Sequence, residues 1–334
     1  YPETDEIAAD PRVSATWRPA PNWKTDLHLG YYHQYITSIR FSSQEQPNEY
    51  WYPVVGDLPS TKQSLVAAGV ERSDWGPLKL RVTTEGYYKS LKDFLVFYPN
   101  QTASQQNEEG KNASTDGISA SQVTAKGWAA GGEIAVNKED GPWTGSISYG
   151  LGWSVLQQDP FTNSLGTTKF DPTWADWDQR HTFKFASTVN WLGDGENSLW
   201  KSRFKRFYLR STLQANYNSG TPLTGYDGYT STHLIGQGID GAQGTGQPVG
   251  VEGNTYVGPG FRNQERKPDY FRADLTLLDI GQASKWRVYY TIINLTDHDN
   301  VYTISYDTKE NPPKKDITYQ FPRLPFFLGA EYEF

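Results

Sequence analysis

The sequence of 334 residues contains neither cysteine nor methionine. The absence of cysteine excludes a disulfide framework and metal sites built on thiolates. Because methionine is missing even at position 1, we expect a mature or truncated product without its initiator or any signal peptide. No run approaches the roughly 18 consecutive apolar residues that a transmembrane helix requires. A net charge of −7 without a clustered basic face argues against a nucleic-acid partner.

Aromatic residues, in contrast, are abundant and make up 15% of the chain, with 12 Trp, 22 Tyr and 15 Phe. Such residues form girdles at both interfaces of membrane-spanning barrels. The mean hydropathy is low, at −0.69. This value is compatible with a membrane barrel, since only alternate residues of a barrel strand face lipid.

Eleven segments alternate between apolar and polar residues with the period of two that indicates β-strands. In the second segment, for example, Leu27 and Tyr31 share one face, whereas Asp26 and Gln34 share the other. The predicted strands cover residues 11–18, 23–38, 62–73, 77–90, 121–138, 142–156, 178–191, 204–218, 269–280, 285–306 and 322–334.

The connections between these segments alternate between short and long. Short turns on one side and long loops on the other are typical of an antiparallel transmembrane β-barrel of the outer-membrane type. A soluble sandwich or water-soluble barrel alternates in the same way, but strands of about 10–16 residues exceed the usual length in soluble sheets. The short connections lie near 19–22, 73–76, 139–141, 192–203 and 281–284, and the long ones near 40–61, 91–120, 157–177, 219–266 and 307–320.

The last predicted strand places five apolar residues on one face and ends on an aromatic residue. These residues are Phe326, Leu328, Ala330, Tyr332 and Phe334. The pattern resembles the assembly signal of bacterial outer-membrane proteins. The resemblance assigns Tyr332 and Phe334 to recognition by the barrel-assembly machinery.

Several short motifs, in their order and spacing, resemble the closing strands of TonB-dependent outer-membrane receptors. The resemblance implies a 22-stranded barrel whose N-terminal plug binds TonB, and which imports scarce ligands such as ferric siderophores, cobalamin or glycans. The sequence shows no plug and only about half of the strands. The motifs are Asp-Gln-Arg-His at 178–181, Asn-Ser-Gly-Thr-Pro at 218–222, and the segments 267–275, 286–289, 293–301 and 322–325.

We therefore expect residues 1–334 to form a single all-β barrel domain of about 11–12 strands in the bacterial outer membrane. It would be the C-terminal half of a receptor barrel in contact with outer-membrane lipid. An open sheet edge is not tolerated in lipid, so another segment or another chain has to complete the barrel. A missed strand within residues 1–10 would instead allow a closed twelve-stranded barrel.

Two other functions stay open at this point. A passive porin-like channel would carry a constriction loop, and a structural barrel would serve as a scaffold in an outer-membrane complex. An enzyme is disfavoured, because Ser231 and His233 lack a nucleophile elbow. The five histidines lack the spacing of a metal site. We assign no catalytic residue, metal or cofactor.

Aromatic residues in the long loops are the candidate ligand contacts, because their faces suit sugar rings and catecholate rings. The alternative is that they belong to the outer girdle or pack loop against loop. Charges on the polar faces of the strands, such as Lys79, Arg81, Glu85, Lys184 and Arg210, would contact a plug or water. The candidate ligand contacts are Tyr50, Trp51, Tyr52, Trp174, Trp177, Tyr226 and Tyr229.

Overall fold

The computed structural model is all-β over the residues that it describes. No helix in this part of the chain is long and apolar enough to cross a membrane. The described residues are 8–40, 49–53, 59–97, 122–163, 166–168, 171–193, 197–204, 206–223, 228–231, 255–258, 263, 265–282, 285–307 and 314–333.

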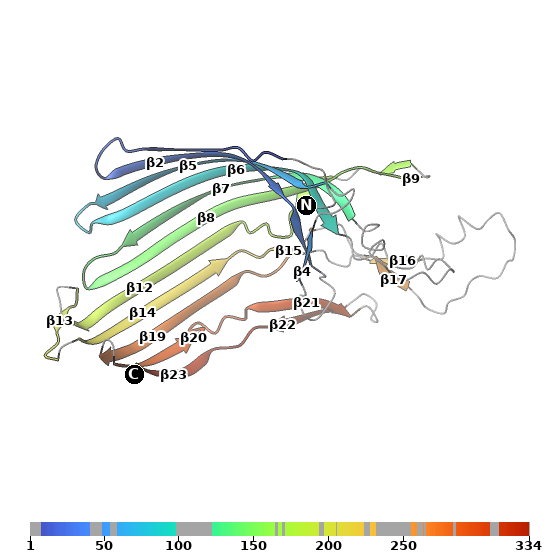
Figure 1. Cartoon of the computed structure of the whole chain (residues 1–334). Coiled ribbons are helices and arrows are strands. Elements are labelled where there is room, and N and C mark those ends of the chain that lie inside the picture. Colours follow the sequence, from blue (N-terminus) through green and yellow to red (C-terminus); the bar gives the residue numbers. More distant parts are fainter. Residues whose placement is uncertain are drawn as a thin grey trace.

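One large sheet contains eleven strands in sequence order, and each pairs antiparallel with the next. The sheet curves from β1 and β2 at one margin to β23 at the other and does not close on itself (Figure 1). The strands are β1 (Arg12–Trp17), β2 (Trp23–Gln34), β5 (Thr61–Trp75), β6 (Leu80–Phe97), β7 (Gln122–Lys138), β8 (Trp143–Gln158), β12 (His181–Gly193), β14 (Phe207–Asn218), β19 (Tyr270–Gln282), β20 (Trp286–Ile293) and β23 (Leu324–Tyr332).

Each of these strands falls within or across one predicted segment, which confirms the predicted fold class. Two of the predicted segments are longer than the strands that form. The segment 285–306 breaks after Ile293, because Asn294 and Asp297 adopt φ values of 51° and 55°. The Asn294 amide closes this turn by bonding the backbone N–H and C=O of His298. The segment 23–38 breaks after Gln34, and the chain then enters a separate hairpin.

Short strands also occur within the connections. Five small two-stranded sheets lie at the loop end of the large sheet, and two short strands pair with the ends of central strands of the large sheet. The two-stranded sheets pair β3 (Ile36–Arg40) with β4 (Glu49–Pro53), β9 (Phe161–Asn163) with β10 (Gly166–Thr168), β15 (Pro222–Leu223) with β18 (Glu265–Arg266), β16 (Gly228–Ser231) with β17 (Thr255–Gly258), and β21 (Val301–Asp307) with β22 (Lys314–Tyr319). These two short strands are β11 (Thr173–Trp174), beside β8, and β13 (Trp200–Lys201), beside β12.

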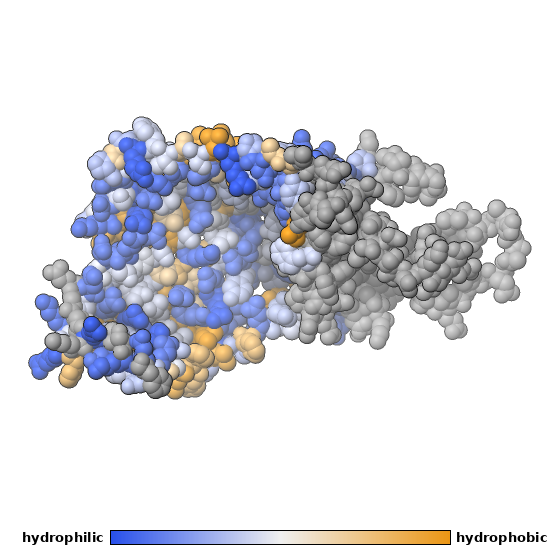
Figure 2. All heavy atoms as spheres, in the orientation of Figure 1, coloured by the Kyte–Doolittle hydropathy of each residue, from blue (hydrophilic) through white to orange (hydrophobic). Residues whose placement is uncertain are grey.

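The strand register gives the sheet one apolar face and one polar face. Cross-strand neighbours share a face, so a row of directly paired residues shows what that face carries. On the apolar face one such row is Leu29, Val66, Tyr88, Ala130 and Trp153. On the polar face one row is Ser148, Lys184, Asn216 and Arg272. Figure 2 shows mostly hydrophilic residues over the middle of the visible face and hydrophobic residues at its upper and lower margins.

Tryptophans gather at the end of the sheet that carries the short turns. Basic side chains lie over some of these rings: Arg72 is 5.0 Å from the Trp23 ring centroid, and Lys138 is 5.9 Å from that of Trp143. An aromatic belt with adjacent cations is what a membrane–water interface favours. The seven tryptophans at this end, out of 12 in the chain, are Trp17, Trp23, Trp75, Trp143, Trp191, Trp200 and Trp286.

Candidate functional site

The loop end of the sheet contains a buried carboxylate, Asp178, in the segment that leads into β12. Its side chain is 0% exposed. One oxygen accepts the backbone N–H of Ser154 on β8 at 2.7 Å. The other pairs with Arg180 at 3.4 Å and with Arg266 of β18. A buried carboxylate requires such partners, since a charge without them is costly to remove from water.

Arg266 joins segments that lie far apart in the sequence. Besides the carboxylate, its Nη1 donates to the backbone carbonyl of Asp178 at 3.2 Å and to that of Gly220 at 2.9 Å. Asn263, only 4% exposed, donates to the Trp174 carbonyl at 2.7 Å and to Asp176 at 2.6 Å. These bonds fix the last residues of the 219–266 connection against the 173–178 segment. We call Asp178, Arg180 and Arg266 the loop-end triad.

The loop-end triad is covered by tryptophan. The Arg180 guanidinium lies 4.5 Å from the Trp174 ring centroid and 5.4 Å from that of Trp153. The predicted contact residue Trp174 is 38% exposed, and Trp177 is 46% exposed. Trp177 packs edge-on against Phe94, 5.4 Å away. Both rings thus pack within the loop end and stay partly exposed, and their role as ligand contacts stays a prediction.

The other predicted contacts lie elsewhere at this end or outside the described residues. Trp51 is 68% exposed on β4. Tyr50 and Tyr52 lie on the same strand, and Tyr229 lies on β16. Tyr226 falls outside the described residues. Of this group, only the side chain of Trp51 is described, and the role of all of them as ligand contacts stays a prediction.

A cavity of about 850 Å³ lies at the same end, between the β21–β22 hairpin, the start of β23, the start of β19 and the end of β20. Arg272 places it on the polar face of the sheet. Sequence reasoning did not assign this cavity, because the hairpin that forms one wall was not predicted. Its lining residues are Arg272, Ile293, Asn294, Asn300, Tyr302, Tyr319, Gln320, Phe321, Pro322 and Leu324.

Asp269, just before β19, forms a second polar group at the loop end. It accepts hydrogen bonds from the Tyr217 hydroxyl at 2.7 Å and from the Gly220 backbone N–H at 3.0 Å. The bond from Tyr217 is the main reason why the pKa of Asp269 lies below its ordinary value of 3.8. Burial opposes this effect by raising the pKa, and the Gly220 bond lowers it further. His298 approaches the Asp269 backbone carbonyl at 3.4 Å.

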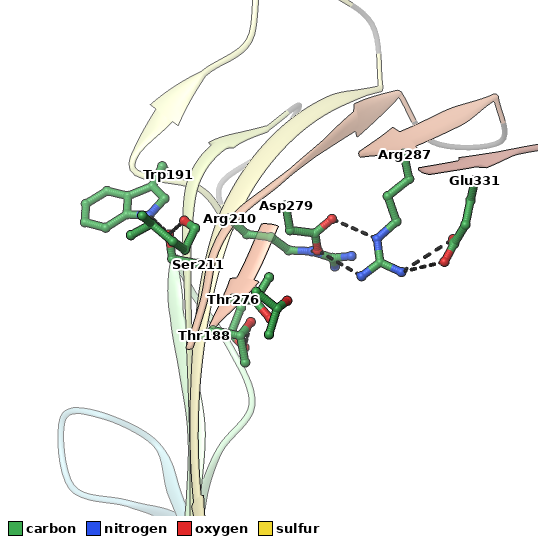
Figure 3. A network of polar contacts seen from close by, with 11 residues as sticks. Thr188, Trp191, Arg210, Ser211, Thr276, Asp279, Arg287 and Glu331 are labelled. Carbon is green, nitrogen blue, oxygen red and sulfur yellow. Dashed lines mark hydrogen bonds and ion pairs between the residues drawn. The ribbon is translucent and has the colours of Figure 1, made fainter. Parts of the chain in front are cut away.

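The turn end carries a different arrangement on the polar face, shown in Figure 3. Asp279 of β19, with 5% of its side chain exposed, pairs with Arg210 of β14 and with Arg287 of β20 at 2.8 Å. Arg287 also approaches Glu331 of β23 at 3.4 Å. We call Asp279, Arg210 and Arg287 the turn-end triad. The sequence identified Arg210 as a polar-face charge but did not identify its partners.

Figure 3 also shows that the two faces are distinct at this end. Ser211 follows Arg210 in the chain, yet it lies on the opposite side of the strands, where the Trp191 indole N–H donates to its hydroxyl at 2.9 Å. At the turn end, the polar face and the apolar face therefore carry separate side-chain contacts.

Comparison with known proteins rests on structure, since no protein-family model matches the chain and no curated protein matches it significantly. The ferripyoverdine receptor of the outer membrane of Pseudomonas aeruginosa, bound to ferripyoverdine, superposes with a TM-score of 0.53 at 11% identity. The likeness covers 96% of this chain and 32% of the receptor. The chain has the fold of an outer-membrane receptor barrel.

A second structure with this receptor-barrel fold is the FrpB iron transporter from Neisseria meningitidis. Its TM-score is 0.52 at 11% identity, over 97% of this chain and 39% of the transporter. The chain thus spans about a third of the length of the proteins it matches. Both neighbours are TonB-dependent outer-membrane receptors, the family that the sequence motifs resemble. They are a receptor and a transporter rather than enzymes.

The assembly signal is partly described. Tyr332 is 67% exposed and pairs across the sheet with Trp286, on the apolar face that also carries Leu328. Phe334 lies outside the described residues. Recognition of these residues by the assembly machinery stays a prediction. Among the described residues, no group of three or more His, Asp or Glu side chains could hold a metal ion.

Proposed function

We propose that the chain forms part of the wall of an outer-membrane receptor that takes up a scarce ligand by energised, TonB-dependent transport. The observation that carries this proposal is the pair of faces maintained across eleven antiparallel strands. The apolar face suits acyl chains, and the polar face suits a wet lumen. Strands such as β6, with 18 residues, exceed the length of about 9–11 residues needed to cross a bilayer.

In this proposal each surface has its own task. The polar face contacts water or a lumen-filling plug, and its charged residues bind the plug. The long connections capture the ligand outside the cell. The matched structures are a ferripyoverdine receptor and an iron transporter, and we propose an iron complex, cobalamin or a glycan as the candidate ligand classes. We propose no catalytic role and treat residues 1–334 as one barrel domain.

The strand count constrains how the barrel closes. With eleven antiparallel strands, the two edge strands β1 and β23 run in the same direction. Two copies related by an axis along the membrane normal would therefore meet along parallel seams. We propose that an odd number of further antiparallel strands completes the barrel, from the same protein or from a partner chain. Leaving both edges unpaired in lipid would cost several kcal/mol for each backbone group.

The two-faced sheet can be tested with adjacent single cysteines, because the chain has no cysteine of its own. Ile147 lies on the apolar face of β8 and is 45% exposed, whereas Ser148 lies on the polar face. In the membrane-embedded protein, a nitroxide on Ile147→Cys should collide with dissolved oxygen, which partitions into lipid. A nitroxide on Ser148→Cys should not meet lipid.

A label on Ile147→Cys that meets a water-soluble nickel chelate as often as the Ser148→Cys label would contradict the membrane assignment.

Transport is tested separately. Energised uptake should stop when the proton-motive force is collapsed, whereas a passive channel would continue to admit small solutes.

A further inference from the structure

We infer that the cavity bounded by the β21–β22 hairpin binds an uncharged, hydroxylated ring, the chemistry of a neutral saccharide unit. This inference rests on the proposed function and names the class of ligand that the receptor binds at the loop end of the sheet. The volume of about 850 Å³ lies within the range of about 300–1,000 Å³ typical of small-molecule sites.

The charged side chain in the cavity wall is already neutralised. Arg272 donates to Asp274 from Nε, at 2.8 and 3.0 Å to the two oxygens, and from Nη2 at 2.7 Å. Asp274 also accepts the backbone N–H of Asn294 at 2.9 Å. The pair carries no net charge, so it offers little attraction to an anionic ligand that has to lose its water.

The two asparagines of the wall are committed to the fold. Asn300, 3% exposed, accepts the backbone N–H of Phe271 and donates to its carbonyl, both at 2.8 Å. Asn294, 2% exposed, closes the turn to His298 with both ends of its amide. Neither side chain is available to a ligand without breaking these bonds to the backbone.

The groups that remain open are aromatic faces and neutral polar atoms. Tyr302 is 55% exposed, Tyr319 51% and Phe321 83%. Within the described part of the chain, the two tyrosine hydroxyls and the Gln320 amide form no side-chain hydrogen bond. The apolar face of a ring packs well on such aromatic surfaces.

A purely apolar ligand would leave these hydroxyls and this amide desolvated and unpaired, which costs about 1–3 kcal/mol for each group. A charged ligand would find no uncompensated partner in the described wall. A neutral ring that carries hydroxyls satisfies both conditions, because it covers the aromatic faces and bonds the phenols and the amide.

The test is isothermal titration calorimetry on the full protein, in a detergent without a sugar headgroup. The neutral probes are maltohexaose, cellohexaose and xylohexaose, and the charged counterpart is hexagalacturonate. At least one neutral probe should bind with a Kd below about 1 mM and more tightly than hexagalacturonate. The inference is overturned if none binds, or if the anionic sugar or a ferric catecholate binds this cavity more tightly.

Variants locate the binding. Tyr319→Phe removes one open hydroxyl and should weaken the neutral probe about five- to tenfold, in line with the loss of one hydrogen bond. Tyr88→Phe is the matched control, since Tyr88 is also 51% exposed but lies on the apolar face. If the Kd of the neutral probe is unchanged both in Tyr319→Phe and in Tyr302→Ala, the probe binds elsewhere and the site is refuted.

A charge-release variant tests the ligand class directly. Asp274→Asn leaves Arg272 without its counter-charge and should tighten hexagalacturonate about tenfold while leaving the neutral probe within about twofold. If the sugars fail to bind while the Ile147→Cys and Ser148→Cys labels still report lipid and lumen, only this inference fails. If those labels fail as well, the membrane proposal falls.

Discussion

The two ends of the sheet each contain one aspartate held between two arginines, but the two triads join different kinds of structure. At the turn end, Asp279, Arg210 and Arg287 lie on adjacent strands that backbone pairing already aligns. At the loop end, Asp178, Arg180 and Arg266 join β12 to a segment 88 residues away. There the carboxylate also accepts the Ser154 N–H.

The loop-end triad defines the relative position of two distant segments, whereas the turn-end triad reinforces a position that backbone pairing already sets. Removing the turn-end carboxylate leaves the strand ladder intact, so the backbone keeps its register. Removing the loop-end carboxylate leaves Arg180 and Arg266 without its charge and the Ser154 N–H without its acceptor. The described strands β12 and β18 do not pair with each other, so no backbone ladder replaces the lost contacts between them. The same chemistry should therefore have larger consequences at the loop end.

The largest effect is expected for Asp178→Asn, which keeps the shape of the side chain but removes its charge. Breaking a buried ion pair costs about 3–5 kcal/mol, and the partial exposure of Arg180 and Arg266, 24% and 33%, reduces this to about 2–3 kcal/mol. Urea unfolding of the full protein in vesicles measures the loss. Hydrogen exchange should rise mainly at residues 173–180 and 265–268.

Asp279→Asn is the matched change at the turn end. Asp279 is nearly buried, but Arg210 and Arg287 are 41% and 35% exposed and can turn toward water. We therefore expect a smaller loss, of about 1–2 kcal/mol. Hydrogen exchange in β14, β19 and β20 should stay close to that of the unmodified protein. Equal losses in the two variants would contradict the comparison between the triads.

The contrast between the ends also explains what the sequence could reveal. The eleven long strands were predictable, because alternation is a local property that repeats over many residues. Arg266 could not be assigned to Asp178 from the sequence, since the contact depends on how a long connection returns to the sheet. The link between Asp279 and Arg210 was hidden by a register shift between Arg210 and Thr212, because a slip of one residue exchanges the two faces.

The candidate site was less predictable than the fold. Aromatic loop residues could be recognised as a class, and Trp174 and Trp177 do lie at the loop end. The cavity, however, depends on β21 and β22, and the sequence pattern ran through 285–306 without a break. Asn294 and Asp297 were the available signal, because both residue types adopt positive φ more readily than most.

A pH titration sharpens the comparison at the loop end. The pKa of Asp269 is lower in the folded protein than the ordinary value of 3.8. Its contribution to stability is therefore complete above pH 3.8 and is lost as the pH falls through the lower folded value. Asp269→Asn should reduce the acid-dependent loss of stability without changing its slope near neutral pH. Because Asp269 is an exposed residue, we expect only a small difference in the pH dependence of stability between the variant and the unmodified protein. If the stability of the variant depends on acid pH in the same way as that of the unmodified protein, the Tyr217 and Gly220 bonds contribute nothing to stability.

The smallest effect on stability is expected for Glu331→Gln, because within the described part of the chain Glu331 contacts the turn-end triad only through Arg287. Glu331 is 59% exposed and its oxygens lie 3.4 Å from Arg287, so water screens the pair and its contribution is about 0–0.5 kcal/mol. A double-mutant cycle with Arg287→Gln isolates the coupling energy from the separate cost of leaving Asp279 with one arginine. A coupling above about 1 kcal/mol would mean that β23 is held to the sheet by charge as well as by its backbone ladder. In that case the turn-end network would define the position of an edge strand, and its role would approach that of the loop-end triad.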